Sequence, residues 1–394
     1  MKVFKLFLSV IVSLILIAVG FGVGFAYRVF IEDAPISETM PTEDETGGSQ
    51  DDQPSVIVEG DISIHFMELG NKYTGDSIFI QCGDNDILID AGSQNSSATT
   101  IINYVDQYVT DNTLEYVIAT HGHEDHIGAF YSTSTREGIF EHYVVENIID
   151  FPLTSKTDDE ITERSVIGRY YSAREEEIAN GANHWTALEC YNSVNGASRV
   201  IQLSDNVELE ILYNYYYEVR DTSGENNHSV CVMINQGDNH YLFTGDLEAE
   251  GEERLVDFYE ENYGGLPHCI LYKAGHHGSY TSSTDSLMQA ITPEYVVVCC
   301  CAGTAEYTDD PSRQFPSQDF IDRVSPFTDK VYITSVVDNY SDSMSDTTVK
   351  SMNGNIIFTV TDGVISLEFS GHDLKLKDTD WFKENRDCPL AWQT

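Results

Sequence analysis

Two different patterns of apolar residues divide the chain. Residues 6–27 form one apolar run without a charged side chain, whereas from residue 61 onward short apolar runs alternate with polar positions or are bounded by turn residues. The uncharged run is about as long as the 20 residues that a helix needs to cross a bilayer. The short runs are typical of β-strands. The pattern therefore predicts a membrane segment followed by a globular part.

The globular part is predicted to alternate strands with helices. Residues 96–109, 248–262 and 285–291 have helical periodicity, and within the less readable stretch 130–195 the run 173–180 is helix-like. The predicted strands are 62–69, 77–82, 86–92, 114–120, 199–203, 207–214, 229–236, 240–246, 268–275 and 295–300, with a closing hairpin over 353–370. Such an alternation, together with hairpins, predicts an α/β fold with layers around a mixed sheet.

The charges around the apolar run predict its orientation. Lys2 and Lys5 precede the run, and acidic residues follow soon after Arg28. Positive charge before a span favours an N-terminus inside the cell and the remainder outside. We therefore predict a single-pass cell-membrane anchor over residues 1–30, with the folded domain extracytoplasmic. A cleaved signal peptide is the alternative and would give a secreted protein, but its apolar region is usually only about 7–15 residues long.

The segment after the apolar run has the composition of a linker. Residues 31–59 contain three prolines, a Gly-Gly-Ser and many acids, but no Lys or Arg. Like charges extend such a chain, and it has too few apolar residues to form a core. We predict an acidic disordered linker over 31–59, one folded domain over 60–372 and a C-terminal tail over 373–394.

The composition narrows the classes of partner. The chain has 21 Lys and Arg against 65 Asp and Glu, which gives a formal net charge of −44. Such a surface repels polyanions at long range, so a basic groove for duplex DNA is not predicted. The eight cysteines show no paired spacing of the zinc-ribbon type, and those at 231 and 299–301 fit predicted strands as small apolar residues. Outside the cytosol they could also form disulfides.

The clearest chemical signal is a histidine-rich loop directly after the predicted strand 114–120. It reads His-Gly-His-Glu-Asp-His from His121 to His126. Neutral imidazoles and carboxylates are ligands for Zn²⁺ and similar ions. Strand ends are also where sites form in α/β folds. A surface loop that happens to be rich in histidine is the alternative, and the further motifs below argue against it.

This loop resembles the HxHxDH signature of metallo-β-lactamase-fold hydrolases. Other segments resemble one branch of that family, the hydrolase domain of ComEC competence proteins and its stand-alone relatives. These segments are the opening strands over 62–92, the stretch 226–255 with its Thr-Gly-Asp, and the stretch 270–283 with its His-His-Gly-Ser. The resemblance covers residues 62–371. It implies an αββα sandwich with a one- or two-metal site at the sheet edges.

The resemblance also implies which residues bind metal. His121 and His123 would hold the first ion, Asp125 and His126 would hold the second, and Asp246 would bridge both. Ligation by His and Asp without a thiolate permits zinc or manganese. We therefore expect two divalent ions as cofactors.

The resemblance implies further roles without fixing which residue takes each of them. One of His276 and His277 would complete the second site and the other would contact the substrate, and the sequence leaves open which. We count His276 among the ligands, and His277 with Asp125 among the catalytic candidates, because Asp125 could also accept a proton from the bridging water. In the family Asp90 supports the metal loop from behind the ligands. A turn-capping aspartate is the alternative.

The first ion is expected to have a third histidine ligand besides His121 and His123. The geometry of a predicted hairpin provides a candidate for it. Two predicted strands flank a turn at Gly237-Asp238, since such a cluster favours a hairpin. Pairing outward from that turn places Asp246 opposite about Ser229. His228 and Asn227 would then lie beside the bridging ligand, which makes His228 a candidate metal ligand. A surface residue at a tolerant position is the alternative, because ComEC-like sequences usually read Asn-Asn-x-Ser here.

Departures from the branch concern the substrate contacts. A small insertion over 70–76 replaces a tight Gly-Gln-Gly-Asp turn, and residues 313–316, Arg-Gln-Phe-Pro, stand where the branch has a histidine. Candidate substrate contacts are Lys273, Ser279 and Asn227. Lys273 could equally be a strand residue that reaches toward solvent.

The predicted function follows from the metal pair. Two adjacent divalent ions generate a hydroxide at neutral pH and bind both attacking and leaving oxygens, which suits phosphodiester cleavage. We predict a membrane-anchored, extracytoplasmic phosphodiesterase or nuclease, acting on a DNA strand or, as the acidic surface favours, a small phosphodiester. No protein partner is predicted. The alternatives are an esterase acting on phosphorylated cell-envelope components and a non-catalytic surface receptor, and the intact motifs argue against the receptor.

Overall fold

The computed structural model describes residues 62–339, 344 and 346–393. The predicted membrane segment over 1–30 and the predicted linker over 31–59 lie outside these residues. Among the helices that are described, none combines the length and the apolar composition needed to cross a bilayer. The described fold belongs to one compact unit, Pro54–Thr394.

The first of two sheets is mixed and has the strand order β16-β15-β1-β2-β3-β4-β5-β6. Its strands are β1 (Ile62–Phe66), β2 (Ile78–Cys82), β3 (Asn85–Ile89), β4 (Thr113–Ala119), β5 (Val144–Asp150), β6 (Asn183–Thr186), β15 (Ile356–Thr361) and β16 (Val364–Phe369). β3 to β6 run parallel, and the other neighbours are antiparallel. The predicted closing hairpin is therefore confirmed, and it joins the sheet beside β1.

The second sheet has the order β14-β13-β12-β11-β10-β9-β8-β7. Its strands are β7 (Val200–Ser204), β8 (Val207–Ile211), β9 (Val232–Gln236), β10 (Asn239–Phe243), β11 (Leu271–Lys273), β12 (Tyr295–Ala302), β13 (Val331–Asn339) and β14 (Thr348–Ser351). β9 and β10 form the predicted hairpin around Gly237-Asp238, with Tyr241 opposite Ile234.

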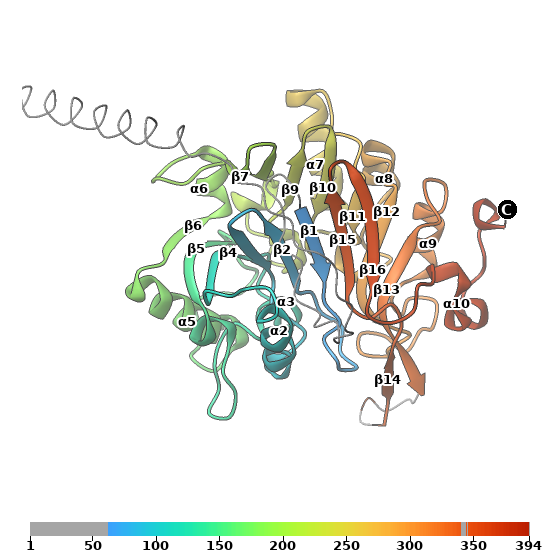
Figure 1. The fold of residues 1–394 in the computed structure, drawn as a ribbon, viewed down its shortest axis with the longest axis horizontal. Coiled ribbons are helices and arrows are strands. Elements are labelled where there is room, and N and C mark those ends of the chain that lie inside the picture. The colour runs from blue at the N-terminus through green and yellow to red at the C-terminus, as the bar shows by residue number, and fades with distance from the viewer. Residues whose placement is uncertain (1–61, 340–343, 345, 394) are drawn as a thin grey trace, which may run out of the picture. The chain divides into compact units, whose positions relative to one another are not determined.

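Helices cover the outer face of each sheet, which gives four layers (Figure 1). The helices that follow strands of the first sheet are α2 (Ala98–Val105), α3 (Glu124–Ile127), α4 (Ile139–His142), α5 (Val166–Asn180) and α6 (Ala187–Asn192). Those of the second sheet are α7 (Ala249–Tyr263), α8 (Asp285–Ile291), α9 (Gln318–Val324) and α10 (Asp380–Asn385). The predicted αββα sandwich is confirmed.

Aromatic side chains join the two sheets. The ring of Phe66 in β1 lies 6.3 Å from that of Phe243 in β10. Phe358 in β15 packs against Tyr241 and Tyr295 of the second sheet, at 5.7 and 5.6 Å between ring centres. Each such side chain contributes about 1.5–3 kcal/mol on full burial. This interface holds the edges of the two sheets, and the loops on them, in a fixed relation.

The segment predicted as a C-terminal tail packs against the domain. Trp381, Phe382 and Trp392 are buried in the apolar cluster beneath α7, α8 and α9. The guanidinium of Arg386 donates to the backbone oxygens of Pro316 and Gln314, at 2.9 and 2.7 Å. Residues 373–393 are thus part of the fold.

In the described structure the eight cysteines form no disulfide, and seven of them are buried. The prediction that Cys231 and residues 299–301 act as small apolar strand residues is confirmed for Cys299, Cys300 and Cys301, which lie in β12 with almost no exposed surface.

Candidate metal centre

The predicted site residues gather where parallel strands of both sheets end. Asp90 follows β3 and His121 follows β4, and these strands pair in parallel. Asp246 follows β10 and His277 follows β11, which are also a parallel pair. Because carboxyl ends of parallel strands meet at one edge, each sheet contributes two of its loops to the same region.

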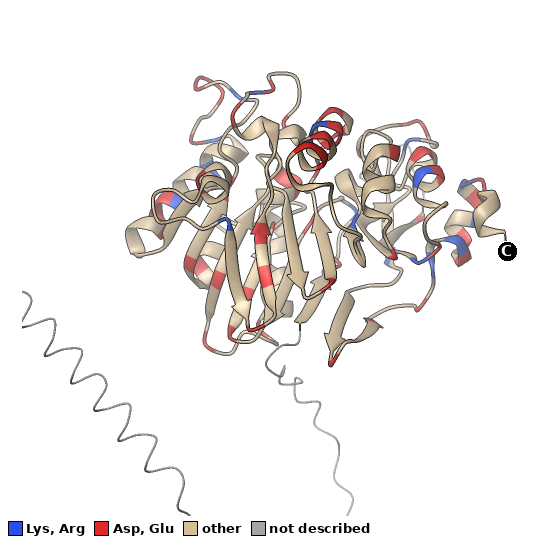
Figure 2. Ribbon diagram, turned by 90° about the horizontal axis from the view of Figure 1, so that it is seen from above, with Lys and Arg blue, Asp and Glu red and all other residues tan. Residues whose placement is uncertain are grey.

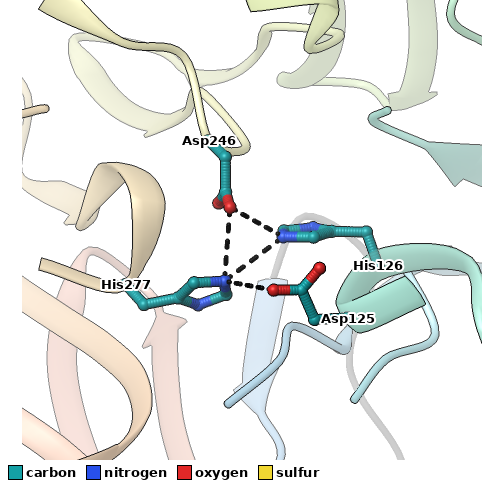
Figure 3. A group of neighbouring side chains, drawn as sticks. All are labelled: Asp125, His126, Asp246 and His277. Carbon is teal, nitrogen blue, oxygen red and sulfur yellow. Dashed lines mark hydrogen bonds and ion pairs between the residues drawn. The ribbon is translucent and has the colours of Figure 1, made fainter. Parts of the chain in front are cut away.

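A four-residue site forms from Asp125, His126, Asp246 and His277, whose side chains point toward one another (Figure 3). The Nε2 atoms of His126 and His277 are 3.3 Å apart, and they lie 3.1 and 3.3 Å from Oδ2 of Asp246. Oδ2 of Asp125 lies 3.6 Å from Nε2 of His277. Such a convergence of ring nitrogens and carboxylate oxygens is the donor set that divalent transition-metal ions bind.

A two-histidine site lies next to it. Nε2 of His121 is 3.1 Å from Nδ1 of His123, and a carboxylate oxygen of Asp125 lies within 4.8 Å of both. The main chain here leaves no room for larger residues: a Cβ on Gly92 would lie 1.5 Å from the backbone oxygen of Asp125. The loop after β3 therefore presses directly on the ligand loop and fixes its position.

Hydrogen bonds behind the ligands orient the histidine rings. Oδ2 of Asp90 lies 2.7 Å from Nδ1 of His126, and its carboxylate also accepts from the backbone N–H and the hydroxyl of Thr120. Nδ1 of His277 lies 2.9 Å from the backbone oxygen of Cys299. Both rings then present Nε2 to the site, as a metal-binding histidine must. The structure thus places Asp90 where the predicted supporting role requires it.

An ion pair that the sequence analysis did not identify lies behind the four-residue site. The ammonium of Lys273 contacts Oδ2 of Asp76 and is 3.7 Å from Oδ1 of Asp246. Oδ1 of Asp76 is 3.1 Å from Nδ1 of His277. Burial lowers the pKa of Lys273, but the two carboxylates raise it, and the net pKa is above its ordinary value. The ammonium is therefore charged and paired inside the protein.

This burial corrects the prediction for Lys273. Its side chain is 1% exposed, so it neither reaches toward solvent nor contacts a substrate at the surface. The signal available in the sequence was a lysine within an otherwise apolar strand, together with an aspartate, Asp76, directly before another strand. A buried charge of that kind needs a partner of opposite sign.

The charges at the site favour bound cations. Burial lowers the pKa values of His126 and His277, but Asp246 and the neighbouring carboxylates raise them further, so that both lie well above the ordinary value. Burial raises the pKa of Asp246, but these histidines lower it well below its ordinary value. Oδ1 of Asp246 is buried and has no hydrogen-bond donor among the described residues. Such an oxygen is costly unless a cation or donor satisfies it, so the residues fit a divalent metal.

The structure reverses the predicted roles of the two adjacent histidines. His277 is buried in the four-residue site, whereas His276 stays at its rim, with Nε2 4.0 Å from Oδ2 of Asp246. Nδ1 of His276 instead lies 2.9 Å from the hydroxyl of Thr281. His277 is therefore the candidate ligand, and His276 is the histidine available to a substrate.

The structure does not bring His228 to either metal site. Its buried ring lies between two backbone segments, with Nδ1 3.1 Å from the oxygen of Tyr216 and Nε2 3.2 Å from both the nitrogen and the oxygen of Asp221. The predicted hairpin register itself is confirmed, because the backbone N–H of Asp246 donates to the hydroxyl of Ser229 at 3.0 Å. The short helical turn Asn226–His228 then carries the His228 ring away from the ligands.

Two predicted substrate contacts hold loops together instead. Asn227 is buried: its amide donates to Asp221 at 2.8 Å and its side-chain oxygen accepts from the N–H of Glu248 at 3.2 Å. Ser279 is buried too, with its hydroxyl 3.0 Å from that of Thr281. Neither side chain has a hydrogen bond to a residue of the four-residue site among these contacts.

A tyrosine that the sequence analysis did not single out lies at the rim. The hydroxyl of Tyr307 donates to Oδ2 of Asp125 at 2.6 Å. The ring of Tyr307 packs against Phe315, whose own ring lies 5.6 and 5.9 Å from those of His276 and His277. The segment with Phe315 is the one in which the ComEC branch was expected to have a histidine.

Comparison with known proteins agrees with this site. Residues 70–152 and 218–302 match the model of the metallo-beta-lactamase superfamily, and these ranges include the whole four-residue site. The chain carries a metallo-β-lactamase domain. It is homologous to ComEC-like competence proteins.

Two curated relatives and one solved structure illustrate the similarity. The chain is 32% identical over 121 residues to "Competence protein ComA" of Neisseria gonorrhoeae, covering 31% of this chain and 16% of that protein. It is 26% identical over 188 residues to "ComE operon protein 3" of Bacillus subtilis (strain 168), covering 47% and 20%. The chain thus spans a fifth or less of the length of these relatives. The metallo-beta-lactamase fold protein YhfI from Bacillus subtilis aligns with a TM-score of 0.38 at 10% identity, over 70% of this chain and 96% of that one.

Proposed function

We propose that this protein is a phosphodiesterase that uses two divalent metal ions. The observation that carries the proposal is the charge gathered at the site. Asp76, Asp90, Asp125 and Asp246 supply four carboxylates and Lys273 one ammonium. Metal binding requires the imidazoles to be neutral, and the net charge of the protein groups is then −3. One divalent ion would leave the site negative, whereas two leave a single positive charge. A phosphodiester carries one negative charge, which balances the single positive charge of the site with two ions bound.

Each ion has a candidate set of ligands. Asp125, His126, Asp246 and His277 would hold one ion, and His121 with His123 and a shared carboxylate would hold the other. When bound, such ions lower the pKa of a water molecule and stabilise the charge on the attacking and leaving oxygens. Zinc and manganese both suit these nitrogen and oxygen donors.

The chain's own residues organise the reaction around these ligands. Asp90 and the backbone oxygen of Cys299 fix the His126 and His277 rings. Lys273 pairs with Asp76 and lies 3.7 Å from Asp246; burial raises the pKa of Asp76, but the ammonium lowers it further. The Asp125 carboxylate, 13% exposed, is the candidate to accept a proton from the attacking water.

The acidic surface favours a small phosphodiester over a long nucleic acid strand. Asp and Glu outnumber Lys and Arg by 65 to 21 in the chain, and Figure 2 shows red ribbon segments far outnumbering blue ones. Long-range repulsion would slow the approach of a polyanion. Relatives named for competence, and one named "Recombination protein 2", support a DNA strand as the second substrate class.

We also propose that the apolar run over 6–27 anchors the protein in the cell membrane, with the domain outside. The support is the length of that run and the lysines that precede it. Reaction at the cell surface would then use external phosphodiesters.

The test is hydrolysis by the full chain in detergent, depleted of metal and reloaded with Zn²⁺ or Mn²⁺. Bis(p-nitrophenyl) phosphate, single-stranded DNA and p-nitrophenyl acetate separate a phosphodiesterase, a nuclease and a carboxyl esterase. We expect His277→Ala to lose phosphodiester hydrolysis by about 100-fold or more, since even partners outside the ligand set cost 10–100-fold. His228→Gln is the matched control and should bind the same number of ions as the wild type.

Two results would contradict the proposal. One is equal phosphodiester hydrolysis by the wild type and His277→Ala. The other is a wild type that binds metal but cleaves neither phosphodiester, which would favour the envelope esterase or the receptor.

A further inference from the structure

Tyr307 belongs to the loop after β12, at the rim of the four-residue site. We infer that Tyr307 is a positioning residue that holds the Asp125 carboxylate for metal binding, and that this loop thereby sets the affinity of the four-residue site. The inference rests on the metal site of the proposed function.

The first support is the contact itself. The phenol oxygen of Tyr307 is 2.6 Å from Oδ2 of Asp125, the length of a hydrogen bond between a hydroxyl and a charged carboxylate. The same Oδ2 is the oxygen that faces His277 across the site, at 3.6 Å. Tyr307 therefore fixes the Asp125 oxygen that must lie near His277 for these residues to bind one ion together.

The second support is that the tyrosine is itself held in place. Its side chain is 51% exposed, yet its ring packs on Phe315 at 5.4 Å between ring centres. The neighbouring Glu306 accepts the backbone N–H of Thr74 at 2.8 Å, and the N–H of Gly303 donates to the oxygen of Phe315 at 2.9 Å. A tyrosine that packs on Phe315, in a loop held at two further points, can orient a ligand, whereas a free surface tyrosine cannot.

The third support is that one loop reaches ligands from both sheets. Tyr307 contacts Asp125 in α3, which follows β4, while Phe315 packs on His277 in the loop after β11. Residues 303–316 thus bridge the two halves of the four-residue site on its solvent side.

The experiment compares metal binding by the full chain in detergent with that of Tyr307→Phe and Tyr263→Phe. Tyr263 is the matched control, because it is equally exposed, at 52%, and its hydroxyl also makes hydrogen bonds, to Tyr191 and Arg199. Metal-depleted protein is titrated with Zn²⁺ against a chelating dye to obtain both dissociation constants. The visible absorption spectrum of the Co²⁺-loaded protein reports the coordination of Asp125.

We expect Tyr307→Phe to weaken the four-residue site about tenfold, the lower end of the range for partners that orient ligands. The two-histidine site should change less, the Co²⁺ spectrum should shift, and Tyr263→Phe should match the wild type. Unchanged constants and an unchanged spectrum in Tyr307→Phe would overturn the inference. Equal weakening of both sites with a lower melting temperature of the metal-free protein would also overturn it, since that result indicates general destabilisation.

Failure of the proposed function gives a different result. A wild type that binds both ions but cleaves no phosphodiester contradicts the proposed function, while a tenfold shift in Tyr307→Phe still supports the positioning role.

Discussion

At the scale of single residues, Lys273 controls the balance of charge in the metal centre. Its ammonium contacts Asp76 and lies 3.7 Å from Oδ1 of Asp246. Removing one partner of a buried ion pair leaves an uncompensated charge, which costs about 3–5 kcal/mol. We expect Lys273→Met to lower the free energy of unfolding of the metal-depleted protein by about that amount, measured by urea denaturation.

The control for this prediction is the double variant Asp76→Asn with Lys273→Met. Because it removes the charge that would be left alone, it should be more stable than Lys273→Met by itself. A Lys273→Met protein as stable as the wild type would show that the pair contributes nothing.

At this scale the sequence predicted ligands that are close together in the chain better than those in irregular loops. His121, His123, Asp125 and His126 come together because a single short loop and the first turn of α3 carry all four. The adjacent His276 and His277 could not be told apart, since both adopt left-handed backbone angles, with φ of 44° and 54°. Those angles decide which ring turns inward, and residue spacing does not reveal them.

At the scale of elements, β1 contains a histidine that makes stability depend on pH. His65 is buried, with its ring nitrogens 2.8 Å from the hydroxyls of Ser63 and Tyr104. Burial lowers its pKa to about 3, against an ordinary value of 6.5. Between these two values the unfolded chain binds one more proton than the folded chain. The stabilising contribution of neutral His65 is therefore complete above pH 6.5 and is lost as the pH falls toward 3.

His65→Gln should remove this pH dependence. Between pH 6.5 and 4.5 the free energy of unfolding of the wild type should fall more steeply than that of the variant, by about 1.4 kcal/mol per pH unit. Urea denaturation of both proteins in the presence of chelator measures the difference, because the other titrating groups are common to both. Parallel slopes would mean that His65 takes up its proton in the folded state.

Elements with a regular apolar pattern could be predicted from the sequence. The start of a helix that is set by a capping side chain could not. The β9–β10 hairpin follows from apolar alternation on both sides of a Gly-Asp turn. In the stretch 130–195 the sequence indicated a helix only over 173–180, whereas α5 begins at Val166. Ser165 caps that helix by accepting the N–H of Gly168 at 3.2 Å. The first half of α5 buries the apolar residues Ile167 and Tyr170. Two such residues are not enough to produce a periodic pattern in the sequence.

At the scale of the whole molecule, the metal centre connects the two sheets. His121, His123, Asp125 and His126 come from the first sheet, and Asp246 and His277 from the second. Bound ions therefore act as cross-links that the unfolded chain lacks. A ligand at 100 times its dissociation constant stabilises the folded state by about 2.7 kcal/mol. We expect a divalent ion to raise the melting temperature, and a chelator to reverse the rise.

The control for this prediction is His277→Ala, which removes the contribution of the second sheet. Its melting temperature should respond much less to added Zn²⁺ or Mn²⁺ in a thermal scan. An equal rise in both proteins would place the stabilising ion elsewhere.

The sequence predicted the sandwich as a whole, but it divided the end of the chain incorrectly. Residues 373–394 were predicted to be a C-terminal tail, although Trp381, Phe382 and Trp392 complete the apolar cluster beneath α7, α8 and α9. Three separated aromatic residues give no periodic pattern, and their partners lie in distant parts of the chain. Only the tertiary structure shows that they belong to the core.

The position of the β15–β16 hairpin has a consequence for folding while the chain is being synthesised. Among the described strands β1 is the first to be made, yet its neighbour β15 is nearly the last, with Ile62 opposite Val360. Every metal ligand has been translated before the first sheet can close. A nascent or truncated chain that lacks residues after 355 would hold the complete set of ligands on a sheet with an open, apolar edge. Such an intermediate presents unpaired backbone groups along β1 and is therefore prone to aggregate until the hairpin is complete.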